Sequence, residues 1–230
     1  MRAYLGDILL SALALAVVPL TFYIGLRAHS GGLAGRTAIR RAIHLSSGCF
    51  ILFVPLFPHP IAPILVCLAI GAFVALMNPR SRLMKGYFVM LAENEELELG
   101  YLQGPLAFAG ALTAACGFMA LFPENRAVYI AAVLAMVIGD PIAAYVGKRY
   151  GRHRIRIGKR RYSRSLEGTL AMLASTLLSC LGVALLYSGL SPLRILALSL
   201  IATAVEAVSP GKWDDILIPV ATSLLMFLVP

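Results

Sequence analysis

Long apolar stretches alternate with short polar or charged stretches along the whole chain. A helix needs about 20 apolar residues to cross roughly 30 Å of hydrocarbon. By that criterion the pattern predicts about eight membrane helices, at residues 6–26, 42–58, 60–77, 103–122, 127–147, 167–188, 192–209 and 214–229. Asp7 and Pro19 interrupt the first stretch and no small-x-small cleavage pattern follows it, so we expect a membrane helix there, not a signal peptide. The prediction is an all-α polytopic membrane helix bundle, with residues 1–230 as a single integral membrane domain.

Composition agrees with a membrane protein. Hydrophobic residues make up 60% of the 230 positions and charged residues only 13%, which lies far outside the range of soluble globular domains. The four cysteines fall one in each of four predicted helices, with no short pair spacing. This distribution predicts neither a disulfide framework nor a zinc site.

The basic residues predict how the bundle is oriented. Of the 20 Lys and Arg residues, 17 lie in the loops after the first, third, fifth and seventh predicted helices. The positive-inside rule therefore places those loops in the cytoplasm and both termini on the other side. A basic rim beside anionic lipid headgroups accounts for the net charge of +9, so membrane lipids are expected partners and nucleic acid is not. The sequence leaves open whether the protein forms a homo-oligomer.

Asp140 is the most informative acid, because it lies about seven residues inside the fifth predicted helix. That position is roughly 10 Å from the helix end at 1.5 Å per residue, and an unpaired charge there costs several kcal/mol. Pro141 follows directly, so we expect the backbone around 138–141 to open and free carbonyls beside the carboxylate. The pattern favours a bound cation; a buried ion pair with an Arg or His is the alternative.

Small residues and cations surround this acid. Gly139, Ala143, Gly147 and Gly151 recur every four residues and predict a smooth ridge, suited either to helix packing or to close approach of an anionic ligand. The cytoplasmic loop 148–164 then carries nine Lys and Arg residues. Such a number suits phosphates, although topology and lipid headgroups explain many of them equally. We expect this loop to close over a bound nucleotide as a lid.

The sixth predicted helix starts with a second polar group. Ser165 is placed to cap the helix and Glu167 lies in its first turn, where the helix dipole favours an acid. A helix N-terminus beside cationic side chains is also a common phosphate-binding site. Both interpretations stay open.

The residues from 139 to 169 resemble the CTP-dependent lipid kinases, a family that includes dolichol kinase, phytol kinase and the fungal CTP-using diacylglycerol kinase. The shared pattern is Gly139, Asp140, Ala143, Gly147 and Gly151, followed by Arg164, Ser165, Glu167, Gly168 and Thr169. "RRAIHLSSG" at 40–48, "GYLQGPLAF" at 100–108 and "VEAVSPGKWDDILIP" at 205–219 are similar to further family elements. The chain departs from the family in having Arg164 for a lysine and Asp215 for an asparagine.

The resemblance implies a membrane kinase that transfers the γ-phosphoryl group of CTP, with Mg²⁺, to a long-chain isoprenoid alcohol of the polyprenol, dolichol, phytol or geranylgeraniol type at the cytoplasmic face. It implies catalytic roles for Asp140, Glu167, Glu206 and Asp214. It implies nucleotide or phosphate contacts for Gly139, Gly147, Lys148, Gly151, Lys159, Arg164, Ser165 and Gly168. It implies metal contacts for Asp140, Glu167 and Asp215. It implies lipid or phosphate contacts for Arg41 and His44.

Several of these residues have structural alternatives. Arg41 and His44 could be an interfacial anchor, and Glu206 and Asp214 could be helix caps. Phosphatidate cytidylyltransferases share a similar central segment, but their C-terminal signature is absent here, which favours the kinase. An anion or nucleotide carrier is the alternative outside the enzymes, and a structural membrane scaffold would leave Asp140 unexplained. No Walker motif or protein-kinase loop is present, so we expect no ordinary ATP-binding fold.

Overall fold

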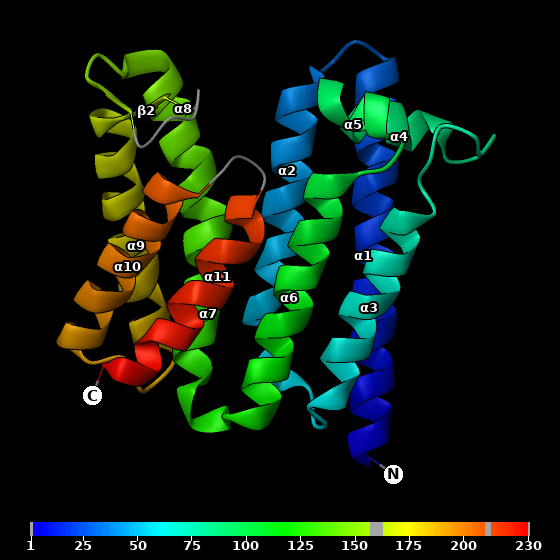
Figure 1. The fold of residues 1–230 in the computed structure, drawn as a ribbon. Coiled ribbons are helices and arrows are strands. Elements are labelled where there is room, and N and C mark those ends of the chain that lie inside the picture. Colours follow the sequence, from blue (N-terminus) through cyan, green and yellow to red (C-terminus); the bar gives the residue numbers. More distant parts are fainter. Residues whose placement is uncertain (1, 157–162, 210–212, 230) are drawn as a thin grey trace. The chain divides into compact units, whose positions relative to one another are not determined.

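The computed structural model describes residues 2–156, 163–209 and 213–229. It is a helical protein with one short hairpin of two strands among these residues (Figure 1). The chain divides into two compact units, Met1–Cys116 and Gly117–Pro230, and each is described separately. The prediction of one domain over 1–230 stays a prediction.

The first unit contains the helices up to α6. These are α1 (Arg2–Ser30), α2 (Arg36–Gly48), α3 (Ile61–Ala75), the short α4 (Lys85–Leu91) and α5 (Asn94–Leu99), and the start of α6 (Gln103–Leu121). Two 3-10 turns, η1 (Cys49–Leu52) and η2 (Val54–Leu56), extend α2. A cluster of buried apolar side chains from α1, α2 and α4 holds this unit together, with Phe22, Ile39 and Phe88 among its members.

Asp7, which interrupts the apolar pattern of α1, has a partner from outside its own helix. Its carboxylate accepts a hydrogen bond of 3.2 Å from the backbone N–H of His59 and also pairs with the ring Nδ1 of the same residue. Tyr4 stacks on that ring. The acid therefore ties the start of α1 to the segment before α3, which offsets the cost of its burial.

The second unit is built around the chain from residue 123 to residue 150. It contains η3 (Pro123–Asn125), α7 (Arg126–Leu134), the π-helical turn η4 (Ala135–Gly139), α8 (Asp140–Tyr150), β1 (Arg154–Arg156), β2 (Ser163–Ser165), α9 (Leu166–Leu186), α10 (Pro192–Val208), α11 (Asp214–Leu225) and η6 (Met226–Leu228). Every residue of α7 from Ala127 to Leu134 is buried. Since α7 contacts α9, α10 and α11, it is the central helix of this unit.

All eight predicted apolar segments coincide with helices, and five of them are long and apolar enough to cross a membrane. These five are Ala3–Ser30, Arg36–Leu56, Gln103–Leu121, Pro123–Tyr150 and Leu166–Leu186. The helix Ile61–Ala75 is apolar but shorter. The all-helical membrane architecture is therefore supported, while the count of eight spans and the orientation of the termini stay predictions.

Candidate functional site

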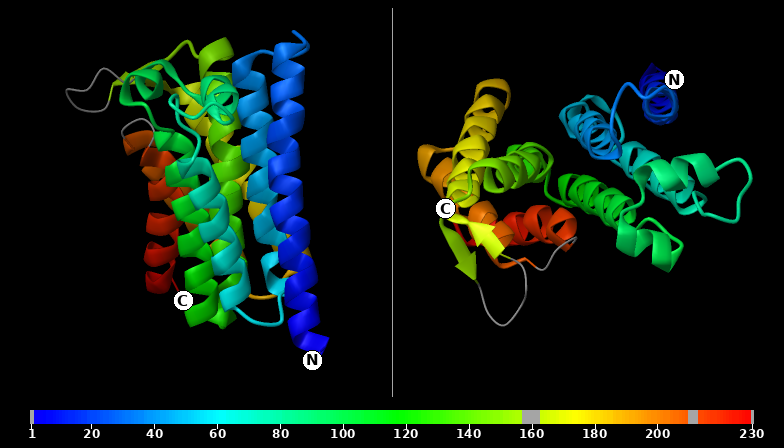
Figure 2. Two further views of the ribbon diagram at one scale, coloured as in Figure 1. Left: turned by 90° about the vertical axis from the view of Figure 1, so that its right-hand side faces the viewer. Right: turned by 90° about the horizontal axis from the view of Figure 1, so that it is seen from above.

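The basic loop folds into a small antiparallel ladder. Ile155 pairs with Arg164 across β1 and β2, and the backbone N–H of Leu166 donates to the carbonyl of His153 at 2.9 Å (Figure 2). The predicted loop 148–164 therefore contains the last turn of α8, all of β1 and most of β2. The sequence of this loop has no apolar periodicity that indicates any of these elements. Lys159, a predicted phosphate ligand, lies outside the described residues.

Arg164 is the centre of a cluster of charged side chains from three segments of the chain. Its Nη1 lies 2.5 Å from Glu206 Oε1 at the end of α10, and its Nη2 lies 3.2 Å from Asp214 Oδ2 at the start of α11. We call these three residues the Arg164 cluster. The Glu206 side chain is only 2% exposed, so its charge needs this arginine nearby.

One carboxylate oxygen of the Arg164 cluster has no hydrogen-bond partner among the described residues. This oxygen is Glu206 Oε2, which is buried. A buried carboxylate oxygen without a partner costs free energy. It is therefore a natural acceptor for a proton, a metal ion or a hydroxyl group brought by a ligand.

Asp140 starts α8 directly after the π-helical turn. Pro141 has no N–H to donate to the carbonyl of Val137, four residues earlier, and its ring crowds that carbonyl. The chain accommodates this with one wide turn of helix, and both Gly139 and Asp140 keep right-handed helical backbone angles. The predicted opening of the backbone thus takes the form of a π-bulge, a feature that is frequent at functional sites. The Asp140 side chain itself is half-buried.

The ridge of small residues packs α8 against α9. A Cβ atom at Gly139 would lie 2.7 Å from Met172 Sδ, and one at Gly168 would lie 2.9 Å from the carbonyl oxygen of Ala143. The other members of this contact are Gly147, Gly151 and Ser165. These glycines therefore allow the two backbones to approach closely. Their predicted contacts with nucleotide stay predictions.

The register of the helices brings Asp140 and Glu206 to a similar level. α10 runs antiparallel to α9, and Ser199 Oγ lies 3.7 Å from Cys180 Sγ. Seven residues further along α10, Glu206 comes level with the turn of α9 that contains Met172. The same turn covers the start of α8, where Asp140 lies. Two acids from distant parts of the sequence thus lie at a similar level along the helices of the second unit.

Glu167 holds the hairpin in the structure. Its Oε1 accepts hydrogen bonds from the backbone N–H of His153 at 3.2 Å and lies 2.8 Å from His153 Nδ1. Ser165 Oγ accepts from the backbone N–H of Gly168 at 3.1 Å, which confirms the predicted helix cap. The described contacts of Glu167 are therefore structural, and its catalytic and metal-binding roles stay predictions.

The donor set of the Arg164 cluster fits Mg²⁺. The described residues contain no group of three or more His, Cys, Asp or Glu side chains that could hold a metal by themselves. Mg²⁺, however, is usually bound by one or two carboxylates together with substrate phosphates. The unpartnered Glu206 Oε2 and the neighbouring Asp214 meet that requirement, with Asp140 at the same level. Asp215 follows at the start of α11, and Lys148 is exposed in the last turn of α8.

Arg41 and His44 lie on α2, in the first unit. The His44 ring is 4.3 Å from the ring of Phe108, and its Nε2 is buried without a hydrogen-bond partner among the described residues. Arg41 is half-buried. The unpartnered nitrogen leaves the predicted lipid or phosphate contact chemically reasonable, and that role stays a prediction.

A buried acid that we did not predict as a site residue pairs with Arg40 of the same helix. Glu96 is 0% exposed and accepts hydrogen bonds from the backbone N–H groups of Glu93 at 2.9 Å and Gly104 at 2.7 Å. Arg40 Nη1 lies 3.1 Å from Glu96 Oε2 and 3.0 Å from Glu93 Oε1. A single acid among four in the stretch "ENEELE" carries no local signal that it is the buried one.

Comparison with known proteins shows relatives only at low identity. No family model matches the chain, and no solved structure matches it. The chain is 28% identical over 210 residues to a protein of Glycine max named "Probable phytol kinase 1, chloroplastic". It is 26% identical over 220 residues to one of Arabidopsis thaliana named "Farnesol kinase, chloroplastic".

These alignments include most of this chain and a smaller part of each relative. They cover 82% and 86% of the chain, but 65% and 67% of the two plant proteins, so the chain spans about two thirds of their length. Both relatives are named as kinases of prenyl alcohols. The chain is thus similar to two such kinases, which supports a relationship to a lipid-alcohol kinase family.

Proposed function

We propose that this protein is a membrane kinase that transfers the γ-phosphoryl group of CTP to a long-chain isoprenoid alcohol, of the phytol, geranylgeraniol or polyprenol type. The similarity to the two plant kinases supports the class of acceptor. The observation that carries the proposal is the Arg164 cluster, because it joins residues from two of the motif segments, 40 to 50 positions apart, around one unpartnered carboxylate oxygen.

The nucleotide is proposed to bind at the hairpin end of the second unit. Arg164, Lys148 and neighbouring loop cations supply positive charge for a triphosphate. Arg164 is held by two carboxylates in the structure, so we expect incoming phosphate oxygens to compete with Glu206 and Asp214 for its guanidinium. The basic loops predict that this end faces the cytoplasm.

Glu206 is the proposed proton acceptor. As the alcohol oxygen attacks the γ-phosphorus, its O–H proton passes to Glu206 Oε2, and the bond from that phosphorus to the bridging oxygen breaks to release CDP. The unpartnered state and burial of this oxygen support the role, since a buried, positioned base works best where water is excluded. Asp140 and Asp214 add carboxylate oxygens for Mg²⁺, which neutralises phosphate charge when it is bound.

The position of the labelled phosphate in CTP distinguishes this kinase from its nearest alternative, a phosphatidate cytidylyltransferase. Purified protein in detergent is incubated with Mg²⁺, CTP labelled at either the α- or the γ-phosphate, and a panel of acceptors: phytol, farnesol, geranylgeraniol, dolichol, diacylglycerol and phosphatidate, the last being the acceptor of the rival reaction. We expect γ-label, and no α-label, to enter the lipid phase with the isoprenoid alcohols. α-Label in the lipid would show cytidylyl transfer instead.

The same assay addresses the donor and the carrier alternative. Replacing CTP by ATP, GTP or UTP at equal concentration should lower the transfer of γ-label. Vesicles containing the protein that accumulate labelled CTP, with no label in any lipid, would identify a carrier and contradict the kinase. If Glu206 accepts the proton, Glu206→Gln should abolish the transfer of γ-label. Glu124→Gln is the matched control and should transfer as the wild type does, since Glu124 is an exposed acid of the same unit.

A further inference from the structure

The hairpin of β1 and β2 carries Arg164 on its second strand. Arg164 lies opposite Ile155 in this ladder, and its guanidinium reaches the carboxylates of α10 and α11 from there. Side chains alternate between the two faces of a strand, so a slip of one residue in the pairing would turn Arg164 to the other face. The register of the hairpin therefore decides whether the Arg164 cluster can form.

This ladder needs an anchor besides its own hydrogen bonds. Each strand has three residues, and a hairpin of two strands is marginally stable at best in water. β2 runs directly into α9, so its position follows from that helix. β1 is connected to α8 through residues 151–153, which form no helix or strand. The anchor is therefore needed at the start of β1.

Glu167 provides that anchor. Its Oε1 and Oε2 accept hydrogen bonds from the backbone N–H of His153 at 3.2 and 3.4 Å, and Oε1 lies 2.8 Å from the ring Nδ1 of the same residue. The carbonyl of His153 accepts a hydrogen bond from the N–H of Leu166 at 2.9 Å. The first two residues of α9 thus bind both backbone groups of the residue directly before β1.

The geometry of this contact matters more than its charge. The side chain of His153 is 75% exposed and that of Glu167 is 25% exposed, and ion pairs so open to water contribute little to stability. The contact depends on an oxygen acceptor at the end of a side chain of this length, which glutamine also has at Oε1. A metal ligand or a proton acceptor would need the carboxylate itself. Replacement by glutamine therefore distinguishes the two kinds of role.

We propose that Glu167 is a positioning residue for phosphotransfer: it holds His153, and through the hairpin it keeps Arg164 in place for the phosphates of the nucleotide. This inference rests on the proposed function. It gives Glu167 a role that differs from the catalytic and metal contacts implied by the resemblance, and neither relative's name assigns it.

The test compares variants of the full chain in detergent, with phytol, Mg²⁺ and CTP labelled at the γ-phosphate. Glu167→Ala should raise KM for CTP about tenfold, the effect of one lost hydrogen bond to a charged group, and should change kcat less than KM, because the reacting groups remain. Glu167→Gln should bring KM back to within about threefold of the wild type, since Oε1 still accepts. The Mg²⁺ concentration for half-maximal transfer should be the same in all three proteins.

A second variant checks that Glu167 acts through His153. His153→Ala keeps the backbone N–H and loses the ring, so KM for CTP should rise about threefold. The double variant Glu167→Ala/His153→Ala should raise KM no further than Glu167→Ala alone does, because the two residues share one contact.

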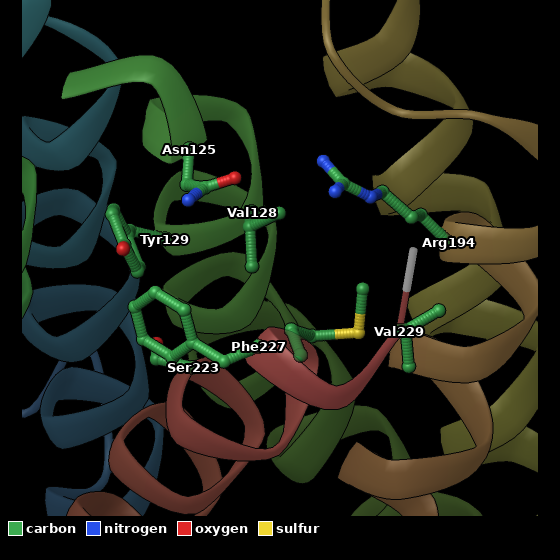
Figure 3. Close-up of a pocket in the computed structure, with 8 residues that line it drawn as sticks. Asn125, Val128, Tyr129, Arg194, Ser223, Phe227 and Val229 are labelled. Atoms are coloured by element: carbon green, nitrogen blue, oxygen red, sulfur yellow. The ribbon is translucent and has the colours of Figure 1, made fainter. Parts of the chain in front are cut away.

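Glu124→Ala is the matched control for Glu167→Ala, because it removes an exposed acid of the same unit at a remote place. Glu124 is next to Asn125, which lines a pocket together with Arg194 (Figure 3). Arg194 lies 12 residues before Glu206 on α10, roughly 18 Å at 1.5 Å per residue. This variant should transfer γ-label as the wild type does.

Hydrogen exchange of the β1 amides reports on the hairpin without any transfer. In Glu167→Ala these amides should exchange about tenfold faster than in the wild type, and in Glu167→Gln they should exchange at nearly the wild-type rate. A wild type that transfers no γ-label would contradict the proposed function, and hydrogen exchange would still decide whether Glu167 holds the hairpin.

Three results would overturn the inference. The first is a wild-type KM for CTP or wild-type hydrogen exchange in Glu167→Ala. The second is a large loss of kcat in Glu167→Gln together with a higher Mg²⁺ requirement, which would show that the carboxylate itself is needed. The third is a double variant in which the two single effects multiply. The glutamine variant decides the case even if Glu167→Ala does not fold.

Discussion

Replacement of Arg164 by glutamine should destabilise the second unit strongly, because it leaves two carboxylates facing each other without a cation. Arg164 is 23% exposed, so an effective dielectric constant near 20 is more appropriate than that of a dry interior. A unit charge pair about 4 Å apart is then worth about 4 kcal/mol. After allowance for the water that replaces the guanidinium, we expect the free energy of unfolding to fall by about 3 kcal/mol. For a chain of this size that corresponds to a melting temperature lower by about 6–12 °C.

Thermal unfolding in detergent measures this shift. Cys180 is fully buried in α9. In a background in which the other free cysteines, Cys49, Cys67 and Cys116, are replaced by serine, a thiol-reactive fluorophore therefore reports when the second unit opens. Arg152→Gln is the control, because Arg152 is an exposed arginine of the same loop. The double variant Arg164→Gln/Glu206→Gln should recover part of the lost stability, since it removes the repulsion between Glu206 and Asp214 and leaves only Asp214 without the arginine, but it should recover no phosphotransfer.

Two results would refute this reasoning. A melting temperature of Arg164→Gln within 1 °C or so of the wild type would mean that the ion pairs contribute little to folding. A double variant that loses the full sum of the two single effects would mean that the residues act independently, in conflict with their contact.

Three further predictions concern the same unit. Gly168→Ala should lower the free energy of unfolding by about 1–2 kcal/mol, because its Cβ would lie 2.9 Å from the Ala143 carbonyl oxygen. Gly182→Ala in the same helix should leave the free energy of unfolding unchanged or raise it, since nothing lies within 4 Å of the added Cβ. Chemical denaturation measures both, and a loss of stability in Gly182→Ala would contradict the packing argument. Ser165→Ala should cost about 1 kcal/mol through loss of the helix cap, visible as a lower melting temperature. Asp140→Asn should preserve membrane insertion and melting temperature while it abolishes Mg²⁺-dependent transfer; near-normal transfer of γ-label would end the assignment of Asp140 as a metal ligand.

Local signals in the sequence predicted the helices better than the site. The apolar runs mark the helices because burial in lipid needs only length and hydrophobicity, and Ser165 could be read as a cap from its own neighbours. The second helix begins earlier than predicted, at Arg36 instead of residue 42. Its polar first turns face the protein, since Ile39 is buried and Arg36 donates to the carbonyl of Ala92.

The contacts that define the site depend on tertiary structure, which a single sequence does not display. Glu206 and Asp214 looked as suited to capping as to catalysis, and only the fold shows that Arg164 joins them. The π-helical turn at Ala135–Gly139 has an apolar sequence like any helix interior, and Pro141 after it was the only sign. The glycine ridge was visible as a pattern, but the choice between ligand and helix as its partner needed the position of α9.

The glycine contact between α8 and α9 also has a mechanical consequence. Few side-chain atoms separate the backbones of α8 and α9, so little can adjust between them, and we expect the two helices to move together as a rigid pair. The hairpin is attached to one end of this helix pair, and Asp140 lies at the other end, directly after the π-helical turn. A displacement of the hairpin would therefore shift Asp140. We expect a ligand that binds at the hairpin, as proposed above, to change the position of this carboxylate inside the bundle.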